Sequence, residues 1–250
     1  MSAGVVKEGQ IVNVEINGAA PLTGALVNKV IDALDRLEDL GGNAIGAFHI
    51  RGSVHAAECS WPGPVDVQLV AKWERALNRV ETVRATTITF VEGACSGVAL
   101  ELLLVSDRRL ASVDFSMRCL SSGRDLWPGM SVYRLSRQIG ESRARQFFLD
   151  GAAASAAGCL KLDIIDEIIA EPANGTALTE RVLQYATFDD VAVWRRLLHE
   201  STSTAFDEAL ATHLAACDRA LRNAAARTRR ESAMAARGED CQDGAATSSR

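Results

Sequence analysis

One continuous run dominates this chain: Phe90-Val91-Glu92-Gly93-Ala94-Cys95-Ser96-Gly97-Val98-Ala99-Leu100-Glu101-Leu102, followed directly by Leu103-Leu104-Val105-Ser106-Asp107-Arg108-Arg109-Leu110-Ala111. A β-branched segment at 86–91 enters a turn of small residues, and an apolar segment with helical spacing leaves it. This order predicts a strand, a tight turn and a helix. The first backbone N–H groups of such a helix lack partners within it, so the turn is suited to binding an anion or a developing oxyanion.

Glu101 is the one acid inside the apolar helix expected at 97–106. Burying a carboxylate is costly and raises its pKa, which suits proton transfer better than solubility. The alternative is a structural acid, either satisfied by a nearby arginine or exposed on a half-buried helix. The residues alone leave both interpretations open.

The composition limits the classes of protein that this chain can belong to. Its 250 residues, 48% of them hydrophobic, are enough for one sizeable domain with a helical appendage. A formal charge of −5 argues against nucleic acid or an anionic membrane surface as a partner. Because no signal-peptide pattern opens the chain and no apolar run approaches the roughly 20 residues needed to span a bilayer, we expect a soluble, cytoplasmic protein.

The cysteines predict neither a metal site nor disulfides. The six of them are scattered, without a Cys-x-x-Cys pair or a nearby histidine cluster, at positions 59, 95, 119, 159, 217 and 241. We interpret them as reduced thiols that serve mostly as small core residues.

A second interpretation of the central run is a nucleophile elbow. Gly93 to Gly97 reads as G-x-C-x-G, which would give a thiol nucleophile in an α/β-hydrolase type of reaction. That reaction needs a histidine late in the chain, on a loop. Only His199 and His213 come late enough, and both lie in segments with a helical pattern, so this alternative is the less favoured one.

Strand and helix patterns alternate along the chain. Strands are expected at 10–16, 44–50, 86–91, 109–111, 115–117 and 164–169, and helices at 22–40, 67–83, 97–106, 130–139, 142–149 and, within a helical region from 178 onward, 205–227. The alternation predicts an α/β fold with a parallel sheet. We divide the chain into a core at 1–188, a helical region at 189–232 and a disordered tail at 233–250.

The run from Glu92 to Ala111 resembles the signature of the crotonase (enoyl-CoA hydratase/isomerase) superfamily, N-G-x-A-x-G-G-G-x-E-L followed by C-D-x-R-x-A. The matching residues are Gly93, Gly97, Glu101, Leu102, Asp107, Arg109 and Ala111. The resemblance extends over about residues 8–230. It implies a spiral of β-β-α turns, with C-terminal helices that pack in a homotrimer or a hexamer.

The resemblance also implies an acyl-CoA thioester as substrate, with coenzyme A as part of that substrate and no further cofactor. Two backbone N–H groups would polarise the thioester carbonyl. One falls at Val98, and the other falls near Ser60 or Trp61, in a loop that lacks the family's A-G-x-D ending. Ser60 and Gly97 are then expected to contact the substrate.

Glu101 falls on the first catalytic glutamate of the family, but the second glutamate position holds Cys119. A thiol hydrogen-bonds weakly and does not position water as a carboxylate does. Asp125 and Trp127 lie in the next loop, where related members place other catalytic acids or aromatic donors. The competing interpretations are a turn residue for Asp125 and a packed aromatic for Trp127.

Three further features resemble one subgroup, the hydratase-like proteins of the 3,5-dihydroxyphenylglycine pathway of glycopeptide antibiotic biosynthesis. They are Lys-Trp-Glu-Arg-Ala-Leu at 72–77, the altered loop before Trp61, and Trp-Pro-Gly-Met at 127–130. This resemblance implies a hydratase/dehydratase or isomerase type of lyase that dehydrates a polyketide-CoA toward 3,5-dihydroxyphenylacetyl-CoA beside a type III polyketide synthase. The alternative is a degenerate scaffold that only stimulates that synthase. Glu101 favours the enzyme and Cys119 favours the scaffold.

Overall fold

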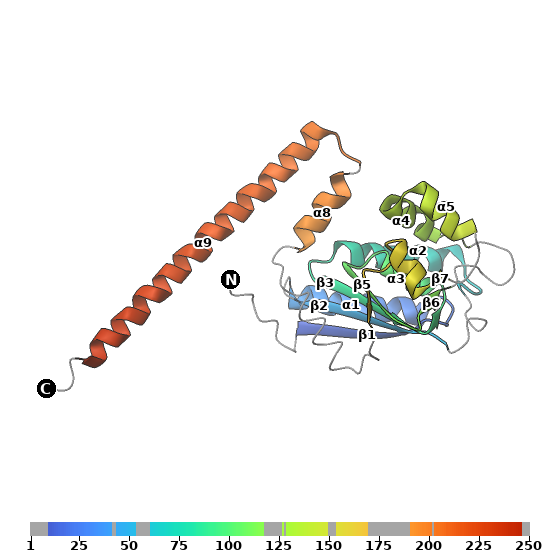
Figure 1. Cartoon of the computed structure of the whole chain (residues 1–250), viewed down its shortest axis with the longest axis horizontal. Helices are drawn as coiled ribbons and strands as arrows, with labels where there is room; N and C mark the ends of the chain where they lie inside the picture. The colour runs from blue at the N-terminus through green and yellow to red at the C-terminus, as the bar shows by residue number, and fades with distance from the viewer. Residues whose placement is uncertain are drawn as a thin grey trace. The chain divides into compact units, whose positions relative to one another are not determined.

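The computed structural model describes residues 10–41, 44–53, 61–117, 127, 129–149, 154–169, 191–201 and 203–246 (Figure 1). The chain divides into two compact units, Met1–Ala192 and Val193–Arg250. The first unit holds both sheets and the helices that pack on them, and the second holds most of the C-terminal helices.

A five-stranded sheet with the order β1-β2-β3-β5-β8 forms the centre of the first unit. Its strands are β1 (Ile11–Asn17), β2 (Ile45–Arg51), β3 (Thr86–Glu92), β5 (Arg108–Ser112) and β8 (Glu167–Ile169), and all neighbours are parallel. The central strands β2 and β3 are buried almost throughout, whereas the edge strand β1 alternates between buried and exposed residues. Strands buried on both faces are typical of a parallel sheet covered by helices, so the α/β expectation is confirmed.

A second, three-stranded sheet is made of very short strands: β4 (Ala94–Cys95), β6 (Ser116–Met117) and β7 (Ala154–Ser155). β4 runs parallel to β6, and β6 runs antiparallel to β7. The chain passes from β3 to β4 at Gly93, whose φ of 68° lies in the left-handed region that favours glycine. Successive strand pairs therefore contribute to both sheets, which is the expected β-β-α arrangement. Periodicity did not predict β4 and β7, because two residues show no alternation.

The helices of the first unit pack with the large sheet around one main hydrophobic core (Figure 1). They are α1 (Gly24–Leu40), α2 (Val67–Thr82), α3 (Gly97–Leu103), α4 (Gly129–Ile139), α5 (Glu141–Leu149) and α6 (Ala156–Lys161). Local side chains fix where two of them begin: Thr23 Oγ1 accepts from Leu26 N at 3.2 Å, and Asp66 Oδ1 accepts from Leu69 N at 2.7 Å. Their apolar faces and the inward side chains of the strands form the main hydrophobic core.

Two charged residues of the central motif have structural contacts. Asp107 Oδ2 accepts from Thr87 N at 2.8 Å and from Thr87 Oγ1 at 2.9 Å, which ties the entry of β5 to β3. Arg109 Nη2 donates to Asp166 Oδ1 at 2.5 Å, and Arg109 N donates to Asp166 Oδ2 at 2.8 Å. These contacts hold the segment before β8 against β5. The strand expected at 164–169 begins only at Glu167, because Ile164 N donates to Cys159 O within a turn.

The C-terminal unit contains α8 (Val191–Ser201) and α9 (Phe206–Ala246). α9 extends through most of 233–250, where the sequence analysis expects a disordered tail. Alanine has the highest intrinsic helix propensity, and the alanines at 233, 235, 236, 245 and 246 favour continuation of the helix. Among the described residues, no helix is both long enough and apolar enough to cross a membrane.

Candidate active site

Glu101 lies in the middle of α3, a helix whose seven residues are all buried. Its side chain is buried with the rest of the helix, and the residue is only 1% exposed. Burial removes the hydration of the carboxylate and raises the pKa of Glu101 from about 4.5 to about 7. The nearby Glu74 carboxylate acts in the same direction, while the Trp73 indole N–H and the Arg134 guanidinium partly oppose the rise of this pKa.

A tryptophan of α2 holds the Glu101 carboxyl. Trp73 Nε1 donates to Glu101 Oε2 at 2.5 Å, and the Trp73 side chain is fully buried. The ring of Trp73 meets the ring of Trp61 edge to face, with the centroids 6.1 Å apart and the planes at 66°. The sequence motifs indicate a role for Trp61 and none for Trp73, although Trp73 lies inside the 72–77 segment.

Trp61 packs directly on the first residue of α3. A Cβ atom at Gly97 would lie 2.2 Å from Trp61 Cδ1 and 2.8 Å from Trp61 Nε1, so only glycine permits this contact. The Nε1 atom of Trp61 is buried and has no hydrogen-bond partner among the described residues. It nevertheless lies near enough to the Glu101 carboxyl to oppose the rise of its pKa. Ser60, the neighbouring candidate, falls outside the described residues.

Trp127 approaches the other oxygen of the Glu101 carboxyl. The point where a Cβ atom would stand on Gly129 is 2.7 Å from Trp127 Nε1 and 2.9 Å from Glu101 Oε1. The indole nitrogen and the carboxyl oxygen therefore converge on the backbone of Gly129. The structure brings Trp127 to Glu101, but its catalytic role stays a prediction. Asp125 and Cys119 lie outside the described residues.

The backbone N–H groups at the start of α3 are the candidate donors for an oxyanion. The N–H groups of Gly97 and Val98 donate to no described residue, whereas Ala99 N already bonds to Ser96 O at 3.1 Å. Ser96 itself is fixed by its N and Oγ atoms, which both donate to Gly18 O, at 2.7 and 2.8 Å. The geometry leaves Val98 N–H available for the oxyanion role that the resemblance implies, and that role stays a prediction.

A buried ion-pair network joins α4 to α2, and the sequence analysis did not predict it. Arg134 Nη1 lies 2.8 Å from Glu74 Oε2, and Arg134 Nε lies 3.2 Å from Glu81 Oε1. Met130 N donates to Glu74 Oε1 at 3.3 Å. The network holds the start of α4, including Gly129, beside the helix that carries Trp73. Nothing local marks this pairing, because Glu74 and Arg134 are 60 residues apart.

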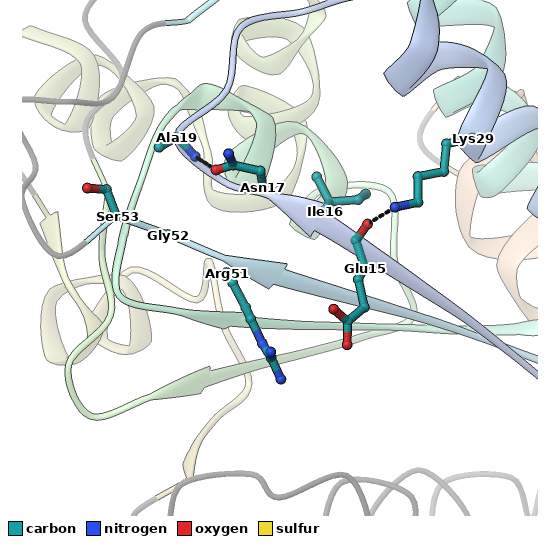
Figure 2. A pocket seen from close by; sticks show the side chains of 8 residues that line it. All are labelled: Glu15, Ile16, Asn17, Ala19, Lys29, Arg51, Gly52 and Ser53. Carbon is teal, nitrogen blue, oxygen red and sulfur yellow. Dashed lines mark hydrogen bonds between the residues drawn. The ribbon is translucent and has the colours of Figure 1, made fainter.

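An open depression of about 610 Å³ lies where β1 and β2 end (Figure 2). It is lined by Glu15, Ile16, Asn17, Ala19, Lys29, Arg51, Gly52 and Ser53. Figure 2 shows Lys29 reaching from α1 to the Glu15 carbonyl, a contact of 2.5 Å, and Arg51 extending from the end of β2. A Cβ atom at Gly52 would lie 2.3 Å from Ala94 O, so one side of the depression adjoins the turn that leads to α3.

The geometry gives no support to the nucleophile elbow. Cys95 is buried and its thiol donates to Glu92 O at 3.4 Å, while His199 and His213 lie on α8 and α9, so the nucleophile elbow remains without a demonstrated histidine. Within the described parts of the chain, no group of three or more His, Cys, Asp or Glu residues is placed to hold a metal ion.

Comparison with known proteins finds a relative by sequence and several solved structures with a similar fold. No family model matches the chain. The chain is 36% identical over 217 residues to an enoyl-CoA-hydratase of Amycolatopsis orientalis, which covers 87% of this chain and 98% of that protein. Its fold is similar to that of an enoyl-CoA hydratase/isomerase from Marinobacter aquaeolei, with a TM-score of 0.71 and 18% identity over 86% of this chain and 89% of that one. An enoyl-CoA hydratase from Mycobacterium smegmatis also gives a TM-score of 0.71, with 17% identity over 85% and 88% of the two chains.

Proposed function

Since this chain belongs to the crotonase (enoyl-CoA hydratase/isomerase) superfamily, we propose that it is an enzyme that acts on an acyl-CoA thioester through a stabilised enolate. The observation that carries the proposal is Glu101, a buried carboxyl with a pKa of about 7, on the helix whose first N–H groups donate to none of the described residues. A general acid/base works best when its pKa lies near the working pH, because both protonation states are then populated.

One carboxyl can perform both proton transfers of a dehydration. Ionised Glu101 removes the proton from the α carbon of a β-hydroxyacyl thioester, and the negative charge that develops on the thioester oxygen is stabilised by Val98 N–H. The protonated Glu101 then gives its proton to the β-hydroxyl group, the C–O bond breaks, and water and the α,β-unsaturated thioester are the products. The carboxylate is regenerated, so the cycle needs no second acid.

The depression at the ends of β1 and β2 supports coenzyme A as part of the substrate. It is lined by two cationic side chains, Lys29 and Arg51, although Glu15 also lines it and Arg51 is paired with Glu92 at 2.9 Å. Lysine and arginine side chains are the groups that bind phosphates such as those of the nucleotide end. Because Gly52 packs on Ala94, a thioester that begins in the depression could reach the turn before α3 over a short path.

The finer proposal is that the acyl group is a cyclised polyketide, dehydrated toward 3,5-dihydroxyphenylacetyl-CoA. Three of the four tryptophans of the chain, Trp61, Trp73 and Trp127, surround Glu101. Indole faces and edges suit a planar ring, and the loss of water from a cyclised polyketide is driven by aromatisation. A site that relies on one acid is sufficient for such a reaction, although it is poorly suited to positioning water for simple hydration.

A scaffold that stimulates a type III polyketide synthase remains the second candidate. The observation in its favour is that Glu101 is closed off by its neighbours in the structure, with 1% of the residue exposed. Catalysis requires the substrate to reach this buried carboxyl, whereas a scaffold requires no access to Glu101.

The test compares the wild type with Glu101→Gln in two assays: hydration of crotonyl-CoA, and formation of aromatic acyl-CoA from malonyl-CoA with a type III synthase. We expect the wild type to hydrate crotonyl-CoA poorly and to stimulate the synthase reaction. In Glu101→Gln we expect this stimulation to fall about 100-fold or more. Glu141→Gln, at an exposed position on α5, is the matched control. Stimulation that survives in Glu101→Gln would establish the scaffold, and brisk hydration without any effect on the synthase would rule out the polyketide substrate.

A further inference from the structure

The two oxygens of the Glu101 carboxyl have different surroundings. Oε2 accepts a hydrogen bond from Trp73 Nε1 at 2.5 Å, inside the core between α2 and α3. Oε1 faces the start of α4, 2.9 Å from the point where a Cβ atom would stand on Gly129, a point that also lies 2.7 Å from Trp127 Nε1. The carboxyl is therefore held at one oxygen and approached by Gly129 and Trp127 at the other.

We propose that Trp73 is a positioning residue that holds Glu101 by Oε2 and makes Oε1 the oxygen that carries and transfers the proton. The catalytic consequence rests on the proposed function, but the placement of the proton does not. Neither the sequence motif nor the similarity to other hydratases assigns a role to Trp73.

The chemistry of indole supports this assignment. An indole N–H is a donor only, so Trp73 cannot accept a proton from the acid. When Glu101 is neutral, its O–H group therefore lies at Oε1, because Oε2 is engaged as an acceptor. When Glu101 is ionised, the bond from Trp73 remains and is strengthened by the charge. The carboxyl thus changes its protonation state without rotating.

The Trp73 ring is itself held on several sides. It is 1% exposed, and it meets the ring of Trp61 edge to face. The next residue on α2, Glu74, is fixed by Arg134 at 2.8 Å and by Met130 N at 3.3 Å. A donor that cannot move fixes the orientation of its acceptor, and misplacement of a reacting group by about 1 Å can cost on the order of 100-fold in rate.

The charged groups that influence the Glu101 carboxyl are Glu74, which raises its pKa, and Arg134, which lowers it. Trp73→Phe leaves both charges in place and removes only the indole N–H and part of the ring. Since that N–H favours the ionised form, its loss raises the pKa of Glu101 above its value in the wild type.

The first experiment measures the four indole N–H resonances of the 15N-labelled full chain over a range of pH, each assigned by a Trp→Phe variant. We expect the Trp73 resonance to shift with a midpoint near pH 7 and to stop titrating in Glu101→Gln, with Trp194, exposed on α8, as the control that does not shift. A Trp73 resonance that does not respond to pH, or that titrates equally in Glu101→Gln, overturns the proposal. This readout needs no substrate, so its result is separate from that of the proposed function.

The second experiment measures the pH profile of the synthase-coupled activity in Trp73→Phe and in the control Trp194→Phe. We expect kcat to fall about 10-fold or more in Trp73→Phe, with KM nearly unchanged and the ionisation midpoint moved to higher pH. A lower melting temperature with an unmoved midpoint would mean that Trp73 only packs, and would overturn the proposal. If Trp73→Phe does not fold, the proposal is tested by the first experiment alone, in which the pH dependence of the Trp73 resonance is compared between the wild type and Glu101→Gln.

Discussion

At the scale of the residue, the burial of Glu101 has an energetic cost that is coupled to pH. The folded chain binds the Glu101 proton more tightly than the unfolded chain, because burial raises the pKa of this carboxyl from about 4.5 to about 7. Between these two values the folded state holds more protons than the unfolded state, so the free energy of unfolding decreases as pH rises. Above about pH 7 the full cost is present, and below about pH 4.5 it vanishes.

Glu101→Gln should therefore be more stable than the wild type at pH 8, by on the order of 3 kcal/mol, since glutamine has no charge to bury and can still accept from Trp73. The difference should shrink steadily as pH falls toward 4.5. Urea denaturation of both proteins at several pH values measures it, with Glu141→Gln as the exposed control. A difference that does not depend on pH would show that Glu101 is not buried in its charged form.

Gly97 is a second residue on which the site depends. A Cβ atom there would collide with the Trp61 ring at 2.2 Å, so Gly97→Ala must displace either the ring or α3. We expect a loss of about 1–3 kcal/mol in stability and a larger loss of activity, measured by denaturation and by the coupled assay. Gly24→Ala is the matched control, because nothing lies within 4 Å of a Cβ atom at that position. Equal behaviour of the two variants would contradict the packing of Trp61 on Gly97.

At the scale of the element, the contact of α4 with α2 depends on Arg134. This side chain is 7% exposed and forms ion pairs with Glu74 and Glu81, whose side chains are also largely buried. Removing one member of a buried ionic network leaves charges without a counter-ion, which is far more costly than losing a surface pair. The same contact holds Gly129 and Trp127 beside Glu101, so stability and activity are coupled through α4.

Arg134→Met should lower the free energy of unfolding by about 3–5 kcal/mol and reduce activity under conditions where the protein remains folded. Arg145→Met, which removes an exposed i,i+4 partner of Glu141 on α5, should cost less than about 1 kcal/mol. Chemical denaturation and the coupled assay, applied to both variants, separate the two cases. If Arg134→Met unfolds no more easily than Arg145→Met, the network does not hold α4 in place.

At the scale of the whole molecule, the C-terminal helices carry large apolar side chains that are not buried within the C-terminal unit. The largest are Trp194, Leu198, Phe206, Leu210, Leu214 and Leu221, which are between 42% and 77% exposed. A helix with an apolar stripe is normally stabilised by packing that stripe against another surface. We propose that these side chains are covered in a homotrimer or hexamer, as expected from the superfamily resemblance.

A chain that ends at residue 188 should therefore be monomeric or insoluble, whereas a chain that ends at residue 230 keeps the apolar stripe and should assemble like the full chain. Sedimentation velocity at several protein concentrations measures the assembly state of all three. A well-behaved trimer of the chain ending at 188 would contradict the role of these helices.

Local patterns determined much of this molecule. The strands at 45–51 and 86–92, the helices at 24–40 and 67–82, and the helix that carries Glu101 were predictable from the sequence, because hydrophobic periodicity and turn residues act over a few positions. The length of α9 was not, because small and polar residues are compatible with both a tail and an alanine-rich helix.

The surroundings of Glu101 were decided only by the tertiary structure. Trp73 lies 28 residues before Glu101 and Arg134 lies 60 residues after Glu74, and no local pattern relates such positions. The sequence predicted an acid on an apolar helix and left open whether it is catalytic or structural. The pKa near 7, the bond at Oε2 and the approach of Trp127 to Oε1 arise because packing removes water from the carboxyl and brings distant donors to it. These effects depend on distance in space, which separation along the chain does not determine.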